Sequence, residues 1–112
     1  MSFFDSDVVR KEMVEIQELQ EEVYTKVFDF PFMDKEDRIE HVQMLEKLLD
    51  KQRVLYTRLS LSDDPEAKLM KENIVKSAKM MGMPENIDMS IVFSNMEKML
   101  KTMRQQVDKD LP

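Results

Sequence analysis

The chain has 112 residues and a formal net charge of −6, and its 42% apolar and 36% charged residues suit a single domain with a core. It contains no cysteine, which excludes disulfides, thiolate metal ligands and thiol catalysis. Neither a secretory signal nor a run of about 18 apolar residues is present, so we expect a cytoplasmic chain without a membrane span.

The first predicted helix covers about residues 6–29. Its apolar residues recur at steps of three, four or seven positions and therefore share one helical face: Val9, Met13, Ile16, Val23 and Val27. Asp5 is the expected N-cap, because its carboxylate can accept hydrogen bonds from the unpaired amides of the first turn. Pro31 lacks a backbone donor and disfavours helical dihedrals in the residue before it, so it should end this helix.

A second helix is predicted at about 35–61, with Asp34 as its N-cap. The connection that precedes it is unusually apolar for an exposed turn, because it carries Phe30, Phe32 and Met33. Two interpretations stay open at this point. These side chains either tuck under the helices or form a contact surface for another molecule.

Two further helices are predicted in the second half of the chain. Ser60–Pro65 is rich in capping residues and ends in a proline that suits the first position of a helix. Gly82, the only glycine, follows where a left-handed residue commonly closes a helix. Asp88 or Ser90 can cap the last helix.

These elements predict an all-α fold that forms one domain over residues 1–112. We expect a long antiparallel hairpin of two helices, with two shorter helices packed across it or beside it, because short connections favour packing between sequence neighbours. The hairpin helices are predicted at about 6–29 and 35–61, and the shorter helices at about 65–81 and 89–108.

No motif in the sequence indicates catalysis or metal binding. His41 is the only histidine, and Arg38 stands three residues before it, so the Glu-x-x-His pattern of di-iron bundles is missing. A single glycine cannot build a phosphate-binding loop, and no serine or threonine has the context of a nucleophile. Carboxylate pairs are unavoidable among 23 Asp and Glu residues and indicate no acid/base site. We therefore expect no enzymatic activity, no cofactor and no bound metal.

The twelve methionines are the main oddity of composition, and they concentrate between residues 80 and 103. Methionine can fill an irregular core or coat a surface that repacks against partners. The methionines of the last helix share or broaden one face and suit core packing: Met89, Met96, Met99 and Met103. Met81 and Met83 flank Gly82 and are harder to bury together, so we expect an apolar patch there. Whether that corner is core or contact surface stays open.

Charge is distributed unevenly along the sequence. Nearly all of the net negative charge lies in residues 1–33, which is typical of a solvated helix face and also suits docking onto a basic partner. Lys98, Lys101 and Arg104 lie on the last helix, but acidic residues alternate with them. Binding to nucleic acid depends largely on lysine and arginine, so this acidic chain is not expected to contact it directly.

Two stretches resemble the most recognisable parts of a family of short helical proteins. They are Phe3-Phe4-Asp5-Ser6-Asp7-Val8-Val9 and Arg53-Val54-Leu55-Tyr56-Thr57-Arg58-Leu59-Ser60-Leu61-Ser62-Asp63-Asp64. The turn at 82–85 is similar to a Gly-Ile-Thr-Pro-Glu type of turn in that family. The family is an uncharacterised domain of unknown function, found mainly in cyanobacteria and also in their phages. The resemblance implies a non-enzymatic helical protein of the host cytoplasm and supplies no catalytic or binding residue.

We interpret the chain as a helical module that binds another protein and forms a homodimer. Phe3 and Phe4 are costly to expose, so they should dock onto the helices or onto a second copy. The contact candidates are apolar residues at the chain start, in the first connection and at the Gly82 corner: Phe3, Phe4, Phe30, Phe32, Met33, Met81 and Met83. Two alternatives stay open, a phage-type accessory regulator of transcription or replication and a virion or assembly component.

Overall fold

The computed structural model of the protein describes residues 2–80, 82–83 and 88–109. Within these ranges it consists of helices and contains no strand, which confirms the predicted all-α class. The α-helices are α1 (Asp7–Lys26), α2 (Lys35–Leu61), α3 (Pro65–Met80) and α4 (Met89–Lys109). Two short 3-10 helices, η1 (Phe3–Asp5) and η2 (Val27–Phe32), precede and follow α1.

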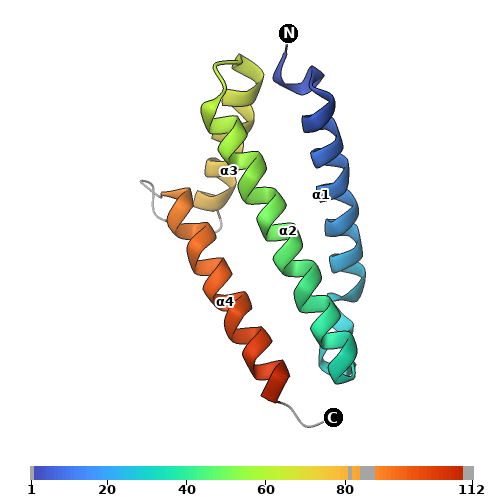
Figure 1. Ribbon diagram of the computed structural model, residues 1–112. Helices are drawn as coiled ribbons and strands as arrows, with labels where there is room; N and C mark the ends of the chain where they lie inside the picture. The colour runs from blue at the N-terminus through green and yellow to red at the C-terminus, as the bar shows by residue number, and fades with distance from the viewer. Residues whose placement is uncertain (1, 81, 84–87, 110–112) are drawn as a thin grey trace.

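The central element is α2, which packs against each of the other three α-helices. As predicted, α1 and α2 form a long antiparallel hairpin, and α4 lies along the opposite side of α2 (Figure 1). The shorter α3 covers only the half of α2 that leads to its C-terminal end (Figure 1). With 21 residues, α4 is as long as the 20-residue α1. The molecule is therefore a slab of 52 × 32 × 19 Å.

Apolar side chains form two clusters that meet on α2. The first joins Val9, Ile16 and Val23 of α1 to the α2 and α3 residues Leu48, Leu55, Leu59 and Ala67. The second joins Leu49 of α2 to Met89 and Phe93 of α4. Ile74 of α3 packs against both clusters. Burial of α2 against neighbours on two sides therefore accounts for most of the core.

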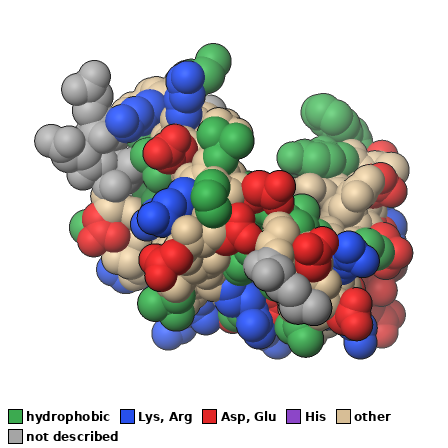
Figure 2. Space-filling model, turned by 90° about the horizontal axis from the view of Figure 1, so that it is seen from above, with side chains coloured by type: hydrophobic (Ala, Val, Ile, Leu, Met, Phe, Trp, Pro, Cys, Tyr) green, Lys and Arg blue, Asp and Glu red, His purple; other side chains and the backbone are tan. Residues whose placement is uncertain are grey.

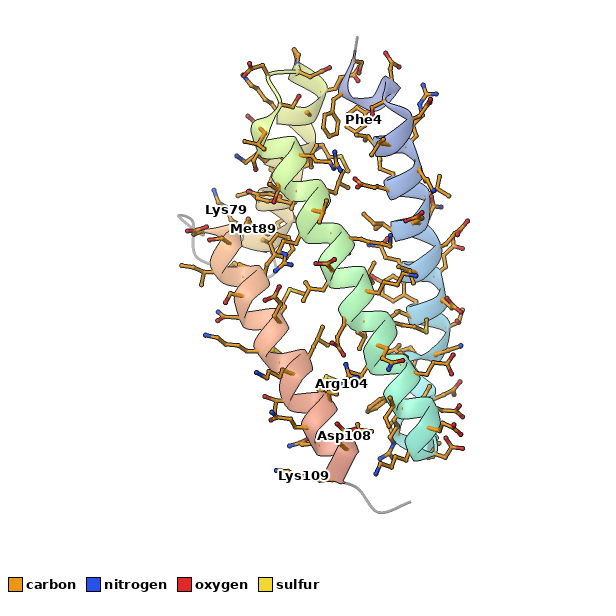
Figure 3. The ribbon with its side chains drawn as sticks, in the orientation of Figure 1. Phe4, Lys79, Met89, Arg104, Asp108 and Lys109 are labelled. Atoms are coloured by element: carbon orange, nitrogen blue, oxygen red, sulfur yellow. The ribbon has the colours of Figure 1, made fainter. Side chains whose placement is uncertain are left out.

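The start of the chain folds back as a clasp, which we define as η1 together with Asp64. The backbone N–H of Phe3 donates to the Asp64 carboxylate at 2.6 Å, and the same carboxylate accepts from the Glu66 N–H at 2.9 Å. Phe3 and Phe4 pack edge to face, and both lie against the first cluster. Phe4 is labelled near the start of the chain in Figure 3. One carboxylate thus caps α3 and fixes the chain start to it.

The expectation that Asp5 caps the first helix was wrong. Ser6 is the N-cap of α1, and its hydroxyl accepts from the Val9 N–H. Asp5 instead completes a capping box with Ser2 around η1. The sequence offers carboxylate and hydroxyl caps side by side, and the extra 3-10 turn shifts the helix start by one residue.

The predicted end of the first helix was also wrong: α1 ends at Lys26, and Pro31 lies inside η2 instead of ending an α-helix at about residue 29. The predicted starts of α2 and α3 and the glycine after α3 are confirmed. Asp34 caps α2 by accepting from the Asp37 N–H at 2.8 Å, and Pro65 is the first residue of α3. Gly82 has a φ of 95° and follows α3. Its N–H donates to the Lys79 carbonyl and the Met83 N–H to the Ala78 carbonyl, the paired bonds of a Schellman motif.

Ion pairs connect α2 to its two long neighbours. Glu15 pairs with Lys51, and Glu12 pairs with Arg58, between α1 and α2. Between α2 and α4, Arg53 pairs with Glu97, and Glu46 pairs with Arg104, which points toward α2 in Figure 3. Several acidic residues of α1 therefore serve the fold itself. No helix in the described part of the chain is long and apolar enough to cross a membrane.

We expect Asp64→Asn to lower the melting temperature by several degrees at pH 7, because the variant weakens both the α3 cap and the anchor of the chain start. Hydrogen bonds from the amides of Phe3 and Glu66 lower the pKa of Asp64 below its ordinary 3.8. The stability from this carboxylate is therefore fully present above the ordinary pKa of 3.8, and it is lost as the pH falls through the lower pKa of the folded chain.

The melting temperatures of the wild type and of Asp64→Asn should accordingly converge in acid. Thermal unfolding followed by circular dichroism between pH 7 and pH 2.5 measures this. Asp63→Asn changes the exposed neighbour and serves as the control. A constant difference between the wild type and Asp64→Asn at all pH values would contradict the role given to the ionised carboxylate.

Candidate functional site

The end of the molecule where α1 meets α2 presents two exposed aromatic side chains. Phe28 is 85% exposed and Phe32 is 89% exposed. Both belong to η2, a 3-10 helix in which residues three apart lie above one another. Phe28 therefore shares its outward face with Pro31, which is also exposed, whereas Phe30 is turned toward His41 of α2. We call Phe28 and Phe32, with the acidic hollow beside them, the aromatic end.

Phe30 holds η2 in place from the inner side. Its ring lies 5.4 Å from the ring of His41, and the Arg38 guanidinium lies 5.7 Å from the Phe30 ring centre. Arg38 also donates to the backbone carbonyls of Phe30 at 3.3 Å and Pro31 at 2.9 Å. These contacts fix the backbone that presents Phe28 and Phe32, so the two rings project from a rigid support.

A hollow of about 600 Å³ lies beside Phe32 and has an acidic rim. Its apolar lining includes Phe32, Met33 and Met44, and Lys26 is its only lysine or arginine. Four carboxylates surround it: Asp29, Asp34, Asp37 and Glu40. The hollow thus combines an apolar floor with a net negative rim.

His41 closes the hollow from below. Its side chain is only 3% exposed, and no hydrogen-bond partner of its Nδ1 is found in the described structure. Burial, with a smaller contribution from the positive charge of Lys26, lowers the pKa of His41 from its ordinary 6.5. The imidazole is therefore neutral near pH 7 and acts as an aromatic packing partner of Phe30.

The contact candidates proposed from sequence separate into different environments. Phe3, Phe4 and Phe30 are half-buried and pack inside this chain, whereas Phe32 is fully presented to solvent. Phe28 is not among the contact candidates, because the predicted α-helix at about 6–29 includes it, whereas the structure forms a 3-10 helix there. The adjacent Val27 and Phe28, which cannot both face the core, were the available signal.

The methionine candidates are divided in the same way. Met33 is half-buried in the wall of the acidic hollow, and Met83 beside Gly82 is 39% exposed. Met81 lies outside the described residues, so the proposed patch at this corner stays a prediction.

The opposite end of the molecule has a different surface. There, acidic, basic and hydrophobic side chains intermix over the chain start and the turn between α2 and α3 (Figure 2). Two exposed aromatic rings beside an acidic hollow therefore distinguish the η2 end. Across residues 2–80, 82–83 and 88–109, no three His, Asp or Glu side chains are placed to hold a metal ion. What the aromatic end offers chemically is apolar contact and negative charge.

Comparison with known proteins identifies a family without a described role. A family model described as "Domain of unknown function (DUF1825)" matches residues 1–107. No curated protein and no solved structure matches the chain. Nearly the whole chain, including the clasp and the aromatic end, thus lies within one family model.

The burial of neutral His41 predicts a pH dependence of stability. Since its pKa is lowered in the fold, the wild type should lose stability as the pH falls below about 6.5, where the unfolded chain binds a proton and the folded chain resists it. His41→Leu removes this titration and the unpartnered nitrogen. The free energy of unfolding of His41→Leu minus that of the wild type should therefore be larger at pH 5 than at pH 7.

Urea unfolding at these two pH values measures the difference. Gln43→Leu places the same new side chain at an exposed site of α2 and controls for the added apolar surface. Equal pH dependence of the wild type and His41→Leu would contradict the assignment of a buried neutral imidazole.

Proposed function

The chain belongs to the DUF1825 family of unknown function, and we propose that it acts as a non-enzymatic module that docks another protein through its aromatic end. The observation that carries this proposal is the pair of Phe28 and Phe32, each more than four-fifths exposed at one end of the hairpin. Apolar surface in contact with water costs about 25 cal/mol per Å². Aromatic side chains are enriched in protein interfaces for this reason.

Rigid presentation makes these two rings suitable as anchors. The backbone of η2 is joined to α1 at one side and is held by the Arg38 hydrogen bonds at the other. Binding to a support of this kind loses little conformational entropy, so more of the contact energy appears as affinity.

The charge around the rings defines the partner's chemistry. Asp29, Asp34, Asp37 and Glu40 give the adjacent hollow a negative rim, with Lys26 as the one opposing lysine. We infer that the partner is a protein segment in which basic side chains flank an apolar anchor. Attraction between such charges speeds association and weakens as salt screens it.

The chemistry of the aromatic end also supports a binding role over a catalytic one. His41 is buried against Phe30 and has its pKa lowered by burial, so it is not offered to a substrate as an acid.

An accessory regulator that touches nucleic acid has less support. Arg104 pairs with Glu46 at 3.2 Å, and Lys101 lines a hollow that also contains Glu46, Asp50 and Glu97. These neighbours offset the charge of Lys101 and Arg104, two of the three basic residues of α4 that such a contact would use. A regulator or virion component that works through protein contacts alone would use the aromatic end proposed above. The cyanobacterial or phage origin and the cytoplasmic location implied by the sequence resemblance belong to the same proposal.

A photo-crosslinking phenylalanine analogue at position 32 tests this function in the producing cells. We expect it to capture one main protein, which is then purified and titrated against the wild type. The double variant Phe28→Ser/Phe32→Ser should bind that protein at least about tenfold more weakly, as expected for aromatic anchor residues. Raising the salt concentration should weaken binding of the wild type.

Leu61→Ser is the matched control, because Leu61 is 81% exposed at the far end of α2. It should bind within about twofold of the wild type, in line with a change outside the interface. Equal binding by the wild type and the double variant would exclude the aromatic end as the docking surface.

A further inference from the structure

A second surface of the molecule is an uncharged apolar trough between α2 and α4, with a volume of about 150 Å³. We define it by its lining residues: Leu45, Leu48, Leu49, Gln52, Met96, Met99, Leu100 and Met103. None of them is charged, although 36% of the chain is charged. Four other hollows in the described structure are each lined by at least four charged residues.

The trough continues the path that α3 occupies on α2. Leu45, Leu48 and Gln52 follow one another at helical spacing and lead on to Leu55 and Leu59 on the same face of α2. At Leu55 and Leu59 this face is covered by α3, whose Ala67 belongs to the same cluster. α3 packs along only half of α2 (Figure 1), so this apolar face of α2 continues past the part that α3 covers.

Three methionines of α4, Met96, Met99 and Met103, form one wall of the trough, and two of them are exposed. Met99 is 66% exposed and Met96 is 42% exposed, whereas Met89 on the same helix is buried. Met103 is half-buried and Val107 is buried, so the exposed methionines form a local patch with buried residues on either side of it along α4. Flexible thioether side chains of this kind adapt readily to an apolar partner surface.

The exposed area of the chain is large enough to supply an interface. A folded monomer of 13.4 kDa exposes about 6,500 Å² on average, whereas this chain exposes 8279 Å². The radius of gyration is 16.1 Å, compared with about 13 Å for a compact chain of this length. The flat shape of the slab accounts for this larger area and provides broad faces, and a standard stable interface needs only ~800 Å² from each partner.

The ion pairs leave this face of the slab free. Two α2 residues pair with α1, namely Lys51 and Arg58, and two pair with α4, namely Glu46 and Arg53. All four lie on other helical faces of α2 than Leu45, Leu48 and Gln52 of the trough. The molecule thus places its interhelical ion pairs away from the trough. Depletion of charge together with enrichment in methionine is the composition of an interface core.

We propose that a second copy of this chain covers the trough, in an isologous dimer that packs two slabs face to face through Met96, Met99 and Met103. The lining carries no charge that would select a differently charged partner, and an uncharged apolar surface is complementary to itself. This dimer goes beyond the proposed docking function and does not depend on it, since the trough and the aromatic end share no residue.

Sedimentation equilibrium of the purified full-length chain tests the proposal. The wild type should have about twice the monomer mass of 13.4 kDa at micromolar concentrations. Met99→Glu introduces one charge per copy at a site already 66% exposed, so each monomer should stay folded while the dimer dissociates at least tenfold more readily. Ile91→Glu is the control on the same helix, because Ile91 is 59% exposed and does not line the trough.

A chemical readout covers the case in which the glutamate disturbs α4. The chain has no cysteine, so Met99→Cys supplies a single thiol with a mild change of side chain. It should react slowly with a bulky maleimide at high protein concentration and rapidly after dilution, whereas Ile91→Cys should react rapidly at both. A monomeric wild type at 100 µM, or equal reactivity of the two thiols, would overturn the proposal.

Discussion

The fold depends on the sharing of one helix, α2, by three neighbours. α1 and α4 lie on opposite sides of it, and each is held by apolar side chains together with ion pairs to α2. α3 adds a third contact over only part of its length. α2 is therefore buried between its neighbours although the helices do not form a closed bundle around it. This flat arrangement gives a slab 19 Å thick. The large exposed area and the open trough both follow from this arrangement.

The two stretches that resemble a known family form one structural unit in three dimensions. Phe3 and Phe4 lie against the cluster that contains Leu59, and the Phe3 amide donates to Asp64 at the end of the second stretch. The side chains of the two stretches fix the chain start to the turn between α2 and α3, so they account for the fold and leave function to surfaces elsewhere.

The fold was largely predictable from the sequence, because its helix ends rest on local chemistry. Asp34, Pro65 and Gly82 act within one or two turns of their own position, and each has the predicted role. Phe28 was missed because η2 winds as a 3-10 helix, which changes the periodicity on which the prediction relied. The Asp64 clasp and the trough join segments far apart in the chain, and no pattern in one helix encodes such pairings.

The two proposed surfaces together determine what the assembly would do. The trough lies between α2 and α4, whereas Phe28 and Phe32 project from the end where α1 meets α2, so one surface can be occupied while the other is free. A dimer formed through the trough presents two aromatic ends, fixed relative to each other by rigid helices. A partner with two matching segments then binds the second in an intramolecular step, and the overall affinity rises without any new contact. Such bivalence gives a small helical slab a means of holding two segments together.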